Sequence, residues 1–143
     1  MNSVFEILSG RQALTKVILE SINQVKSSII IYLPEPNVEV LNAIIRAASR
    51  KKGVQFLLIS NFQDKNLESI TNELKSIKNI QLRRLTSFIE FISTIRDTEE
   101  LILCPLSANE EEMIGFRTTL QSYYTLYSKI IGPIFLANSR PLK

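Results

Sequence analysis

The chain has 143 residues, of which 45% are hydrophobic and 22% are charged, and its net charge is +3. This composition fits one globular domain over residues 1–143, and no apolar run approaches the roughly 20 residues that a membrane-spanning helix needs. The absence of histidine excludes a Ser-His-Asp triad and a histidine-based zinc site. The single cysteine, Cys104, excludes an intrachain disulfide and favours a cytoplasmic location.

The first part of the chain alternates apolar strands with amphipathic helices. The patterns predict strands at residues 4–8, 29–33 and 54–59, and helices at about 12–26 and 38–52. Pro34 ends the second strand because proline cannot donate to the ladder, and Asn37 is expected to cap the following helix. A strand–helix–strand connection of this length crosses over, so its two strands are expected to be parallel.

The later part repeats this pattern and then changes. We expect a helix at 67–77, strands at 80–85, 88–95, 101–104 and 114–118, and a closing helix at 120–134. Asp97 lies in the turn of the hairpin that joins two of these strands, and Gly132 and Pro133 interrupt the closing helix. The order of elements predicts a layered α/β fold, with a mixed, mainly parallel sheet flanked by helices.

Polar residues near strand ends are the candidate ligand-binding residues, because ligands of α/β sheets bind outside the carboxyl ends of the strands. The candidates are Glu35, Asn61, Gln63, Glu90 and Arg117. Glu35 follows the second strand, Asn61 and Gln63 follow the third, and the other two lie in later strands. The alternative is that each of them caps a helix or faces water.

Two clusters of charge have simpler explanations than a ligand site. The first consists of Arg46, Arg50, Lys51 and Lys52. It closes a predicted helix, where cations oppose the negative end of the helix dipole, and a phosphate or nucleic-acid contact is the alternative. The second is the run of glutamates at 110–112, which is expected to be a solvated loop and not a metal or acid site. No metal and no cofactor is predicted.

Aromatic residues on the closing helix form the candidate interface. Tyr123 and Tyr127 lie on one face of this helix, and Phe135 adds a further anchor for self-association. The alternatives are a place in the core or in the wall of a ligand pocket, because buried tyrosine hydroxyls seek partners. The sequence leaves these three roles open.

Several segments resemble the phospholipase-D-like effector domain of TrmB-type archaeal transcriptional regulators. The family has a G-R turn, an I-x-I-x-x-P strand, a helix ending in A-x-x-R/K-G-V-x-V and an x-x-x-D-x-x-E-x-L hairpin. These are matched at residues 9–11, 29–34, 48–56 and 95–101. The resemblance covers nearly the whole chain and includes the closing aromatic helix. It implies a phospholipase-D-like fold and a regulatory, effector-sensing role.

The same resemblance bears on catalysis. Active phospholipase-D-like enzymes carry the motif H-x-K-x-x-x-x-D. With Asp97 at the aspartate position, Glu90 stands at the histidine position and Ile92 at the lysine position. The resemblance therefore implies a chain that has lost this catalysis, with Asp97 serving as a turn residue.

The family's DNA-reading winged helix and the C-terminal extension that helps some members bind sugar are not matched. DNA contact is therefore expected only through a domain absent from this chain. The leading hypothesis is a non-catalytic regulatory domain that forms a homodimer and senses an unknown small-molecule effector, without membrane contact. The alternatives are a stand-alone adaptor that binds another protein and a divergent phospholipase-D-type phosphodiesterase or nuclease.

Overall fold

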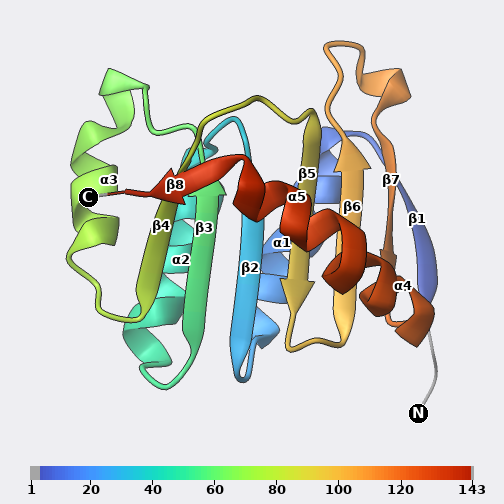
Figure 1. The fold of residues 1–143 in the computed structure, drawn as a ribbon, viewed down its shortest axis with the longest axis horizontal. Coiled ribbons are helices and arrows are strands. Elements are labelled where there is room, and N and C mark those ends of the chain that lie inside the picture. Colours follow the sequence, from blue (N-terminus) through green and yellow to red (C-terminus); the bar gives the residue numbers. More distant parts are fainter. Residues whose placement is uncertain (1–3, 143) are drawn as a thin grey trace.

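The computed structural model describes residues 4–142, which form an eight-stranded mixed sheet with helices on both faces (Figure 1). The strands are β1 (Phe5–Ser9), β2 (Ser28–Leu33), β3 (Gln55–Ser60), β4 (Ile80–Leu85), β5 (Phe91–Arg96), β6 (Glu100–Pro105), β7 (Ile114–Thr118) and β8 (Ser139–Pro141). The helices are α1 (Arg11–Gln24), α2 (Val38–Arg50), α3 (Glu68–Lys75), α4 (Gln121–Leu126) and α5 (Gly132–Ala137). Shorter elements are the 3-10 turns η1 (Lys65–Leu67) and η2 (Glu110–Glu112) and the π-helical η3 (Tyr127–Ile131).

The strand order is β1-β7-β6-β5-β2-β3-β4-β8. The mixed α/β fold is confirmed, but the expectation that the sheet is mainly parallel needs correction. The pairs β2–β3 and β3–β4 are parallel, as expected for strands joined through α2 and α3, and the other five neighbouring pairs are antiparallel. The connections from β5 to β6 and from β6 to β7 are too short for a crossover, so these strands reverse direction.

Local chemistry explains most helix and strand ends. The Asn37 side chain accepts hydrogen bonds from the backbone N–H groups of Glu39 and Val40, at 2.9 and 3.4 Å, so the predicted cap is confirmed. The Lys51 ammonium donates to the carbonyls of Asn23 and Val25 at the end of α1. This contact gives one residue of the basic cluster a structural role, because it satisfies carbonyls that the helix leaves free.

Three boundaries differ from the sequence prediction. The first hairpin strand begins at Phe91 and not at residue 88, and β8 was not predicted. The closing helix runs without a break from Gln121 to Ala137, and its irregular turn is η3, before Gly132. In η3 the Gly132 N–H donates to the Tyr127 carbonyl, which widens the turn and accommodates Pro133, a residue with no N–H to donate. We call α4, η3 and α5 together the C-terminal helix.

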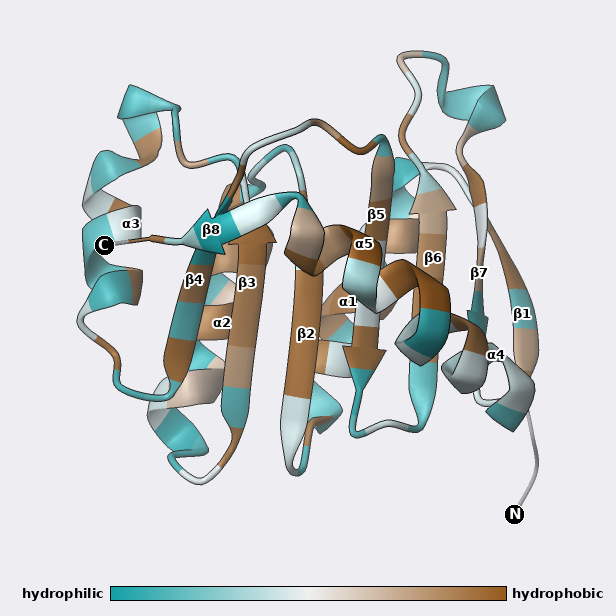
Figure 2. Ribbon diagram, in the orientation of Figure 1, coloured by the Kyte–Doolittle hydropathy of each residue, from teal (hydrophilic) through white to brown (hydrophobic). Residues whose placement is uncertain are grey.

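Two hydrophobic clusters lie on the two faces of the sheet. One packs under α1, α2 and α3, and its largest members include Leu14, Ile44 and Phe56. The other packs under the C-terminal helix and contains Tyr32 and Phe135. Figure 2 shows that β2 and β3 are hydrophobic along most of their length, as expected for strands covered on both faces. Within residues 4–142, no helix is both long enough and apolar enough to cross a membrane.

Candidate functional site

A groove near the carboxyl ends of β2 and β6 brings together two of the predicted ligand-binding residues. Glu35 follows β2 and Glu90 precedes β5, and both line this groove of about 540 Å³. Arg11, Ser107 and Glu112 also line it. Three carboxylates therefore face one guanidinium, and the excess negative charge disfavours the approach of an anion such as a phosphodiester.

Only one of the three positions aligned with the phospholipase D motif reaches this groove. Glu90 lines it, whereas Ile92 is 5% exposed and packs in the core beneath α1 and α2. Asp97 lies just beyond the opposite end of β5, in the hairpin turn. The groove therefore has the position of a strand-end site without the histidine and lysine of the aligned motif.

The Asp97 carboxylate holds the α1–β2 connection in place. It accepts hydrogen bonds from the backbone N–H groups of Lys26, Ser27 and Ser28, at 3.0, 2.7 and 3.1 Å, and from the Ser27 hydroxyl at 3.0 Å. Burial raises the pKa of this carboxyl, but these hydrogen bonds outweigh burial and leave the pKa below its usual value. Its φ of 54° lies in the left-handed region that a tight hairpin turn needs. The structure thus places Asp97 in the turn role that the sequence implied.

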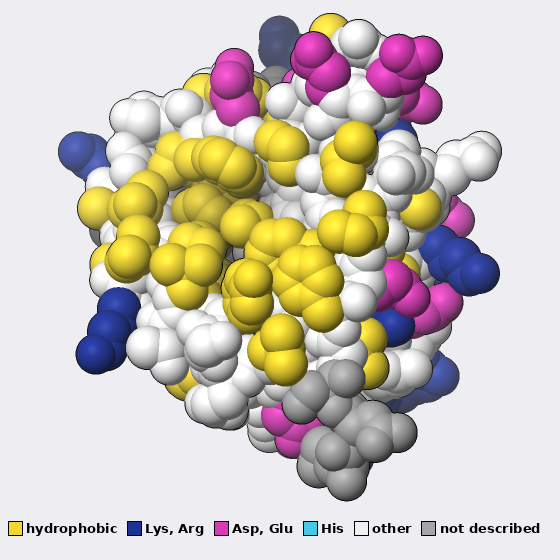
Figure 3. Space-filling model, turned by 90° about the vertical axis from the view of Figure 1, so that its right-hand side faces the viewer, with side chains coloured by type: hydrophobic (Ala, Val, Ile, Leu, Met, Phe, Trp, Pro, Cys, Tyr) yellow, Lys and Arg dark blue, Asp and Glu magenta, His cyan; other side chains and the backbone are white. Residues whose placement is uncertain are grey.

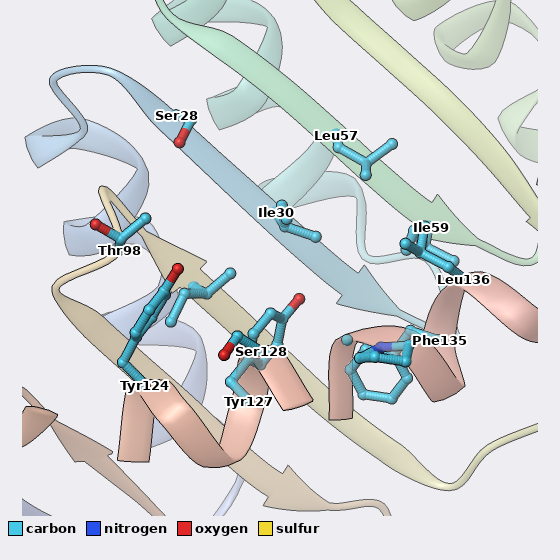
Figure 4. Close-up of a pocket in the computed structure, with 13 residues that line it drawn as sticks. Ser28, Ile30, Leu57, Ile59, Thr98, Tyr124, Tyr127, Ser128, Phe135 and Leu136 are labelled. Carbon is cyan, nitrogen blue, oxygen red and sulfur yellow. The ribbon is translucent and has the colours of Figure 1, made fainter. Parts of the chain in front are cut away.

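A second candidate site is a cavity beneath the C-terminal helix (Figure 4). Its volume is about 280 Å³, and β2, β3 and β5 form its floor. The lining residues are Ser28, Ile30, Leu57, Ile59, Ile95, Thr98, Tyr124, Tyr127, Ser128, Gly132, Pro133, Phe135 and Leu136. None of these side chains carries a charge, so the cavity suits an apolar or uncharged molecule. We call it the lid cavity, because the C-terminal helix covers it.

The Tyr127 hydroxyl is the most unusual polar group in the lid cavity. Tyr127 is 6% exposed, and its hydroxyl forms no hydrogen bond with a described residue. The hydroxyl oxygen is not among the side-chain atoms that are sealed from solvent, so it is accessible from the cavity. Burial raises the pKa of this phenol well above its usual value of about 10, so the group is a neutral donor at physiological pH. The other fully covered tyrosine, Tyr32, instead donates to the Ile89 carbonyl at 3.2 Å.

Gly132 sets the position of the Tyr127 ring. A Cβ atom at residue 132 would lie 3.2 Å from Cε1 of Tyr127 and 3.3 Å from its carbonyl oxygen. Glycine therefore lets the ring pack closely against the π-helical turn. Figure 4 shows the ring rising from the helix toward the sheet, between Tyr124 and Phe135.

Contacts at both ends fix the C-terminal helix over the cavity. Near its start, Tyr123 packs against Phe5 and Phe116, with ring centroids 5.5 and 5.3 Å away. At its end, the Arg83 guanidinium donates to the Ser139 hydroxyl and carbonyl, both at 2.8 Å, and to the Leu136 carbonyl at 3.3 Å. This role of Arg83 could not be predicted from the sequence, because the contact depends on the unpredicted pairing of β8 with β4.

The other predicted ligand-binding residues lie outside both sites. The Asn61 side chain accepts a hydrogen bond from the Gln63 backbone at 3.1 Å, in a local turn after β3. Gln63 lines a separate small hollow of about 200 Å³ beside η1 and α3. The structure thus brings Glu35 and Glu90 together and leaves Asn61 and Gln63 apart from them.

Arg117 belongs to a network of ion pairs between α1 and the sheet. Its guanidinium lies 3.4 Å from Glu6, 3.9 Å from Glu20 and 3.9 Å from Glu100, which is 5% exposed. Glu100 also pairs with Arg96 at 3.3 Å. These contacts give Arg117 a structural role. Its side chain lies on the sheet face opposite the lid cavity, because Arg117 pairs across the strands with Ile102, which packs in the cluster under α1.

The predicted interface residues are mostly buried within the chain. Tyr127 and Phe135 are 6% and 2% exposed and pack against each other and the sheet, so their rings are not free for a partner. Tyr123 is partly exposed. Their placement answers the question that the sequence left open, since Tyr127 and Phe135 belong to the core and also line the lid cavity.

Other hydrophobic side chains do lie on the surface near this helix. We call them the apolar face. They are Phe5 and Ile7 on β1, Ile114 on β7, and Leu126 and Ile130 on the C-terminal helix. Ile7 is 62% exposed and Ile130 is 53% exposed. Figure 3 shows hydrophobic side chains gathered on this side of the molecule, which is hollowed in one part. Because β1 is the last strand of the sheet, this surface also borders an open strand edge.

No cluster of acidic or cysteine side chains in residues 4–142 has the arrangement of a metal site. Glu35, Glu90 and Glu112 share the groove without forming such a cluster. Cys104 is buried and unpaired, and burial raises the pKa of its thiol, so it is a poor nucleophile in this setting.

Comparisons with known proteins reveal similarity in fold. No protein-family model matches the sequence, and no curated protein matches it. NucT from Helicobacter pylori superposes with a TM-score of 0.74 at 14% identity, covering 99% of this chain and 100% of that one. Nuc from Salmonella typhimurium, described as a phospholipase D family member, gives 0.69 at 14% identity and covers 99% of both chains.

TrmBL2, described as an archaeal chromatin protein with a novel mode of DNA binding, gives a TM-score of 0.71 at 17% identity. The match covers 95% of this chain and 54% of TrmBL2. Identities this low establish the fold alone. The chain therefore has the phospholipase-D-like fold, and its function must be inferred from its own residues.

Proposed function

We propose that this chain is a non-catalytic regulatory domain that senses a small-molecule effector and self-associates, as in TrmB-like transcriptional regulators. The observation that carries this proposal is the lid cavity, in which the hydroxyl of the largely buried Tyr127 has no hydrogen-bond partner among residues 4–142. Tyrosines that are mostly buried ordinarily find a hydrogen-bond partner for the hydroxyl, and this hydroxyl is accessible from the cavity, so it is suited to recognise a ligand.

The chemistry of the groove argues against the phosphodiesterase alternative. Glu90 and Ile92 stand where the enzyme motif has histidine and lysine, and the whole sequence contains no histidine. No imidazole nucleophile is available there, and the motif's lysine position holds an apolar residue. The one cation of the groove, Arg11, faces an excess of carboxylates.

The position of the apolar face supports a link between ligand and self-association. Tyr127 lines the lid cavity, and its neighbours Leu126 and Ile130 on the same helix point outward. A ligand that binds one position of the helix more tightly than another would therefore change how the apolar face is presented. A stand-alone adaptor would need only the apolar face and would have no use for the lid cavity. The presence of the cavity therefore favours the sensing role.

Light scattering over a wide concentration range tests self-association. We expect a dimer that Ile7→Glu converts to a monomer, because the new carboxylate would be buried without a partner in the apolar face. Gln81→Glu places the same charge on an exposed position of β4 and should leave the mass unchanged. A wild-type chain that stays monomeric throughout would contradict self-association and favour the adaptor.

Hydrolysis of bis(4-nitrophenyl) phosphate tests the absence of catalysis. We expect no turnover above the buffer rate. Turnover that disappears in Glu90→Gln would instead support the phosphodiesterase alternative, because that substitution removes a groove carboxylate and keeps the side chain's size.

A further inference from the structure

The walls of the lid cavity restrict the charge of any ligand. The central strands supply Ile30, Leu57 and Ile59, and the helix supplies Phe135 and Leu136. An ionised ligand would lose its hydration there without gaining a counter-charge, which is costly. An uncharged, mainly apolar molecule loses little hydration and gains contact with these side chains.

The hydroxyl groups that line the cavity indicate where a bound ligand would carry a polar atom. Ser128 donates to the Thr125 carbonyl of its own helix at 3.3 Å, so its donor is already used. Figure 4 shows Ser28, Thr98 and Tyr124 toward one end of the cavity and Tyr127 nearer to Phe135. Tyr127 is more than nine-tenths buried and its hydroxyl has no described partner. A ligand atom that accepts a hydrogen bond would satisfy this donor.

Volume restricts the size of the ligand. An engineered cavity of about 150 Å³ holds benzene, so by proportion 280 Å³ accommodates roughly eleven non-hydrogen atoms. This corresponds to a bicyclic molecule or a medium-length chain lying within the cavity.

We infer that the lid cavity binds an uncharged, mainly apolar molecule of this size that carries a hydrogen-bond acceptor, such as a ketone oxygen, held by the Tyr127 hydroxyl. This inference deepens the proposed sensing function and rests on it. Tyr127 is the specificity-determining residue, and Gly132 is the position that lets its ring lie against the helix.

The test compares two probes, 1-indanone and indane, by calorimetry on the whole chain. The two share one bicyclic frame, and only 1-indanone has an acceptor. We expect 1-indanone to bind about fivefold more tightly, the effect of one net hydrogen bond. In Tyr127→Phe this advantage should vanish while indane binding stays unchanged. Tyr124→Phe is the matched control and should preserve the advantage.

Methyl NMR locates the binding. Both probes should shift the Ile30 and Ile59 signals and leave Ile44, which packs on the opposite face, unchanged. Absence of binding by both probes, equal affinities in the wild type, or an advantage lost only in Tyr124→Phe would each overturn the inference.

Light scattering with saturating 1-indanone separates this inference from the proposed function. Binding through Tyr127 with an unchanged mass would support the ligand assignment and overturn the link to self-association. A changed mass together with Tyr127-dependent binding would support both.

Discussion

The ring of Phe135 on the C-terminal helix stacks on the ring of Tyr32 in β2, with centroids 3.9 Å apart and 10° between the planes. Tyr32 is fully buried and Phe135 is 2% exposed, so this pair fixes the helix directly to the centre of the sheet. The lid cavity lies beside this contact, because Phe135 is also one of its walls.

Removing the Phe135 ring should loosen the helix. Phe135→Ala is expected to lower the free energy of unfolding by about 3–5 kcal/mol, since it deletes a buried ring and its stacking partner cannot move to fill the space. Ile134→Ala changes the neighbouring residue, which is 45% exposed, and should cost less than about 1 kcal/mol. Urea denaturation followed by circular dichroism measures both. Equal losses of unfolding free energy in the two variants would show that the stacking of Phe135 on Tyr32 adds no specific stability.

The two buried tyrosines should respond differently to loss of the hydroxyl. Tyr32→Phe removes the donor to the Ile89 carbonyl and should cost about 1 kcal/mol of unfolding free energy. Tyr127→Phe removes a donor that bonds to no described residue and that is accessible from the cavity, and should change the free energy of unfolding by less than about 0.5 kcal/mol. Urea denaturation of both variants without ligand tests this contrast. A loss in Tyr127→Phe as large as in Tyr32→Phe would reveal a partner for its hydroxyl in solution.

The Asp97 carboxylate should make stability depend on acidic pH. Its pKa is lower in the folded chain than in the unfolded chain, so its contribution is present above about pH 4 and is lost as the pH falls through the folded-state pKa. Asp97→Asn keeps a residue that tolerates the left-handed turn but loses the charge, and should cost about 1.5–3 kcal/mol at pH 7.

Urea denaturation of Asp97→Asn and the wild type at several pH values measures this effect. The difference between the two chains should shrink as the pH falls toward 2. A difference that stays constant with pH would mean that the carboxylate charge is not what the backbone N–H groups of residues 26–28 recognise.

The buried glutamate of the α1-side network should matter far more than the exposed one. Glu100→Ala leaves Arg96 and Arg117 without their shared carboxylate and should cost about 3–5 kcal/mol. Glu20→Ala removes a partner whose side chain is 43% exposed and should cost less than about 1 kcal/mol. Thermal or urea unfolding distinguishes them. Similar costs for both variants would argue that solvent screens the whole network.

Most of the elements could be predicted from the sequence because their signals are local. The isoleucine run of β2, the asparagine cap at residue 37 and the hairpin turn at Asp97 each depend on neighbours within a few positions. Their physical causes, which are a continuous run of β-branched apolar residues, the capping of free N–H groups and the tolerance of left-handed backbone, are readable from short segments of the chain.

The absence of histidine chemistry also follows from composition, since folding cannot supply a side chain that the sequence lacks. Which polar groups lie close together depends instead on the tertiary structure. It joined Glu35 with Glu90 in one groove, turned Arg117 toward Glu100, and placed Tyr127 under the helix with no hydroxyl partner among residues 4–142. These contacts depend on strand order and register, which involve residues far apart in the sequence. A helical stripe of aromatic residues is equally compatible with a core, an interface or a pocket wall, and only tertiary packing distinguishes these roles.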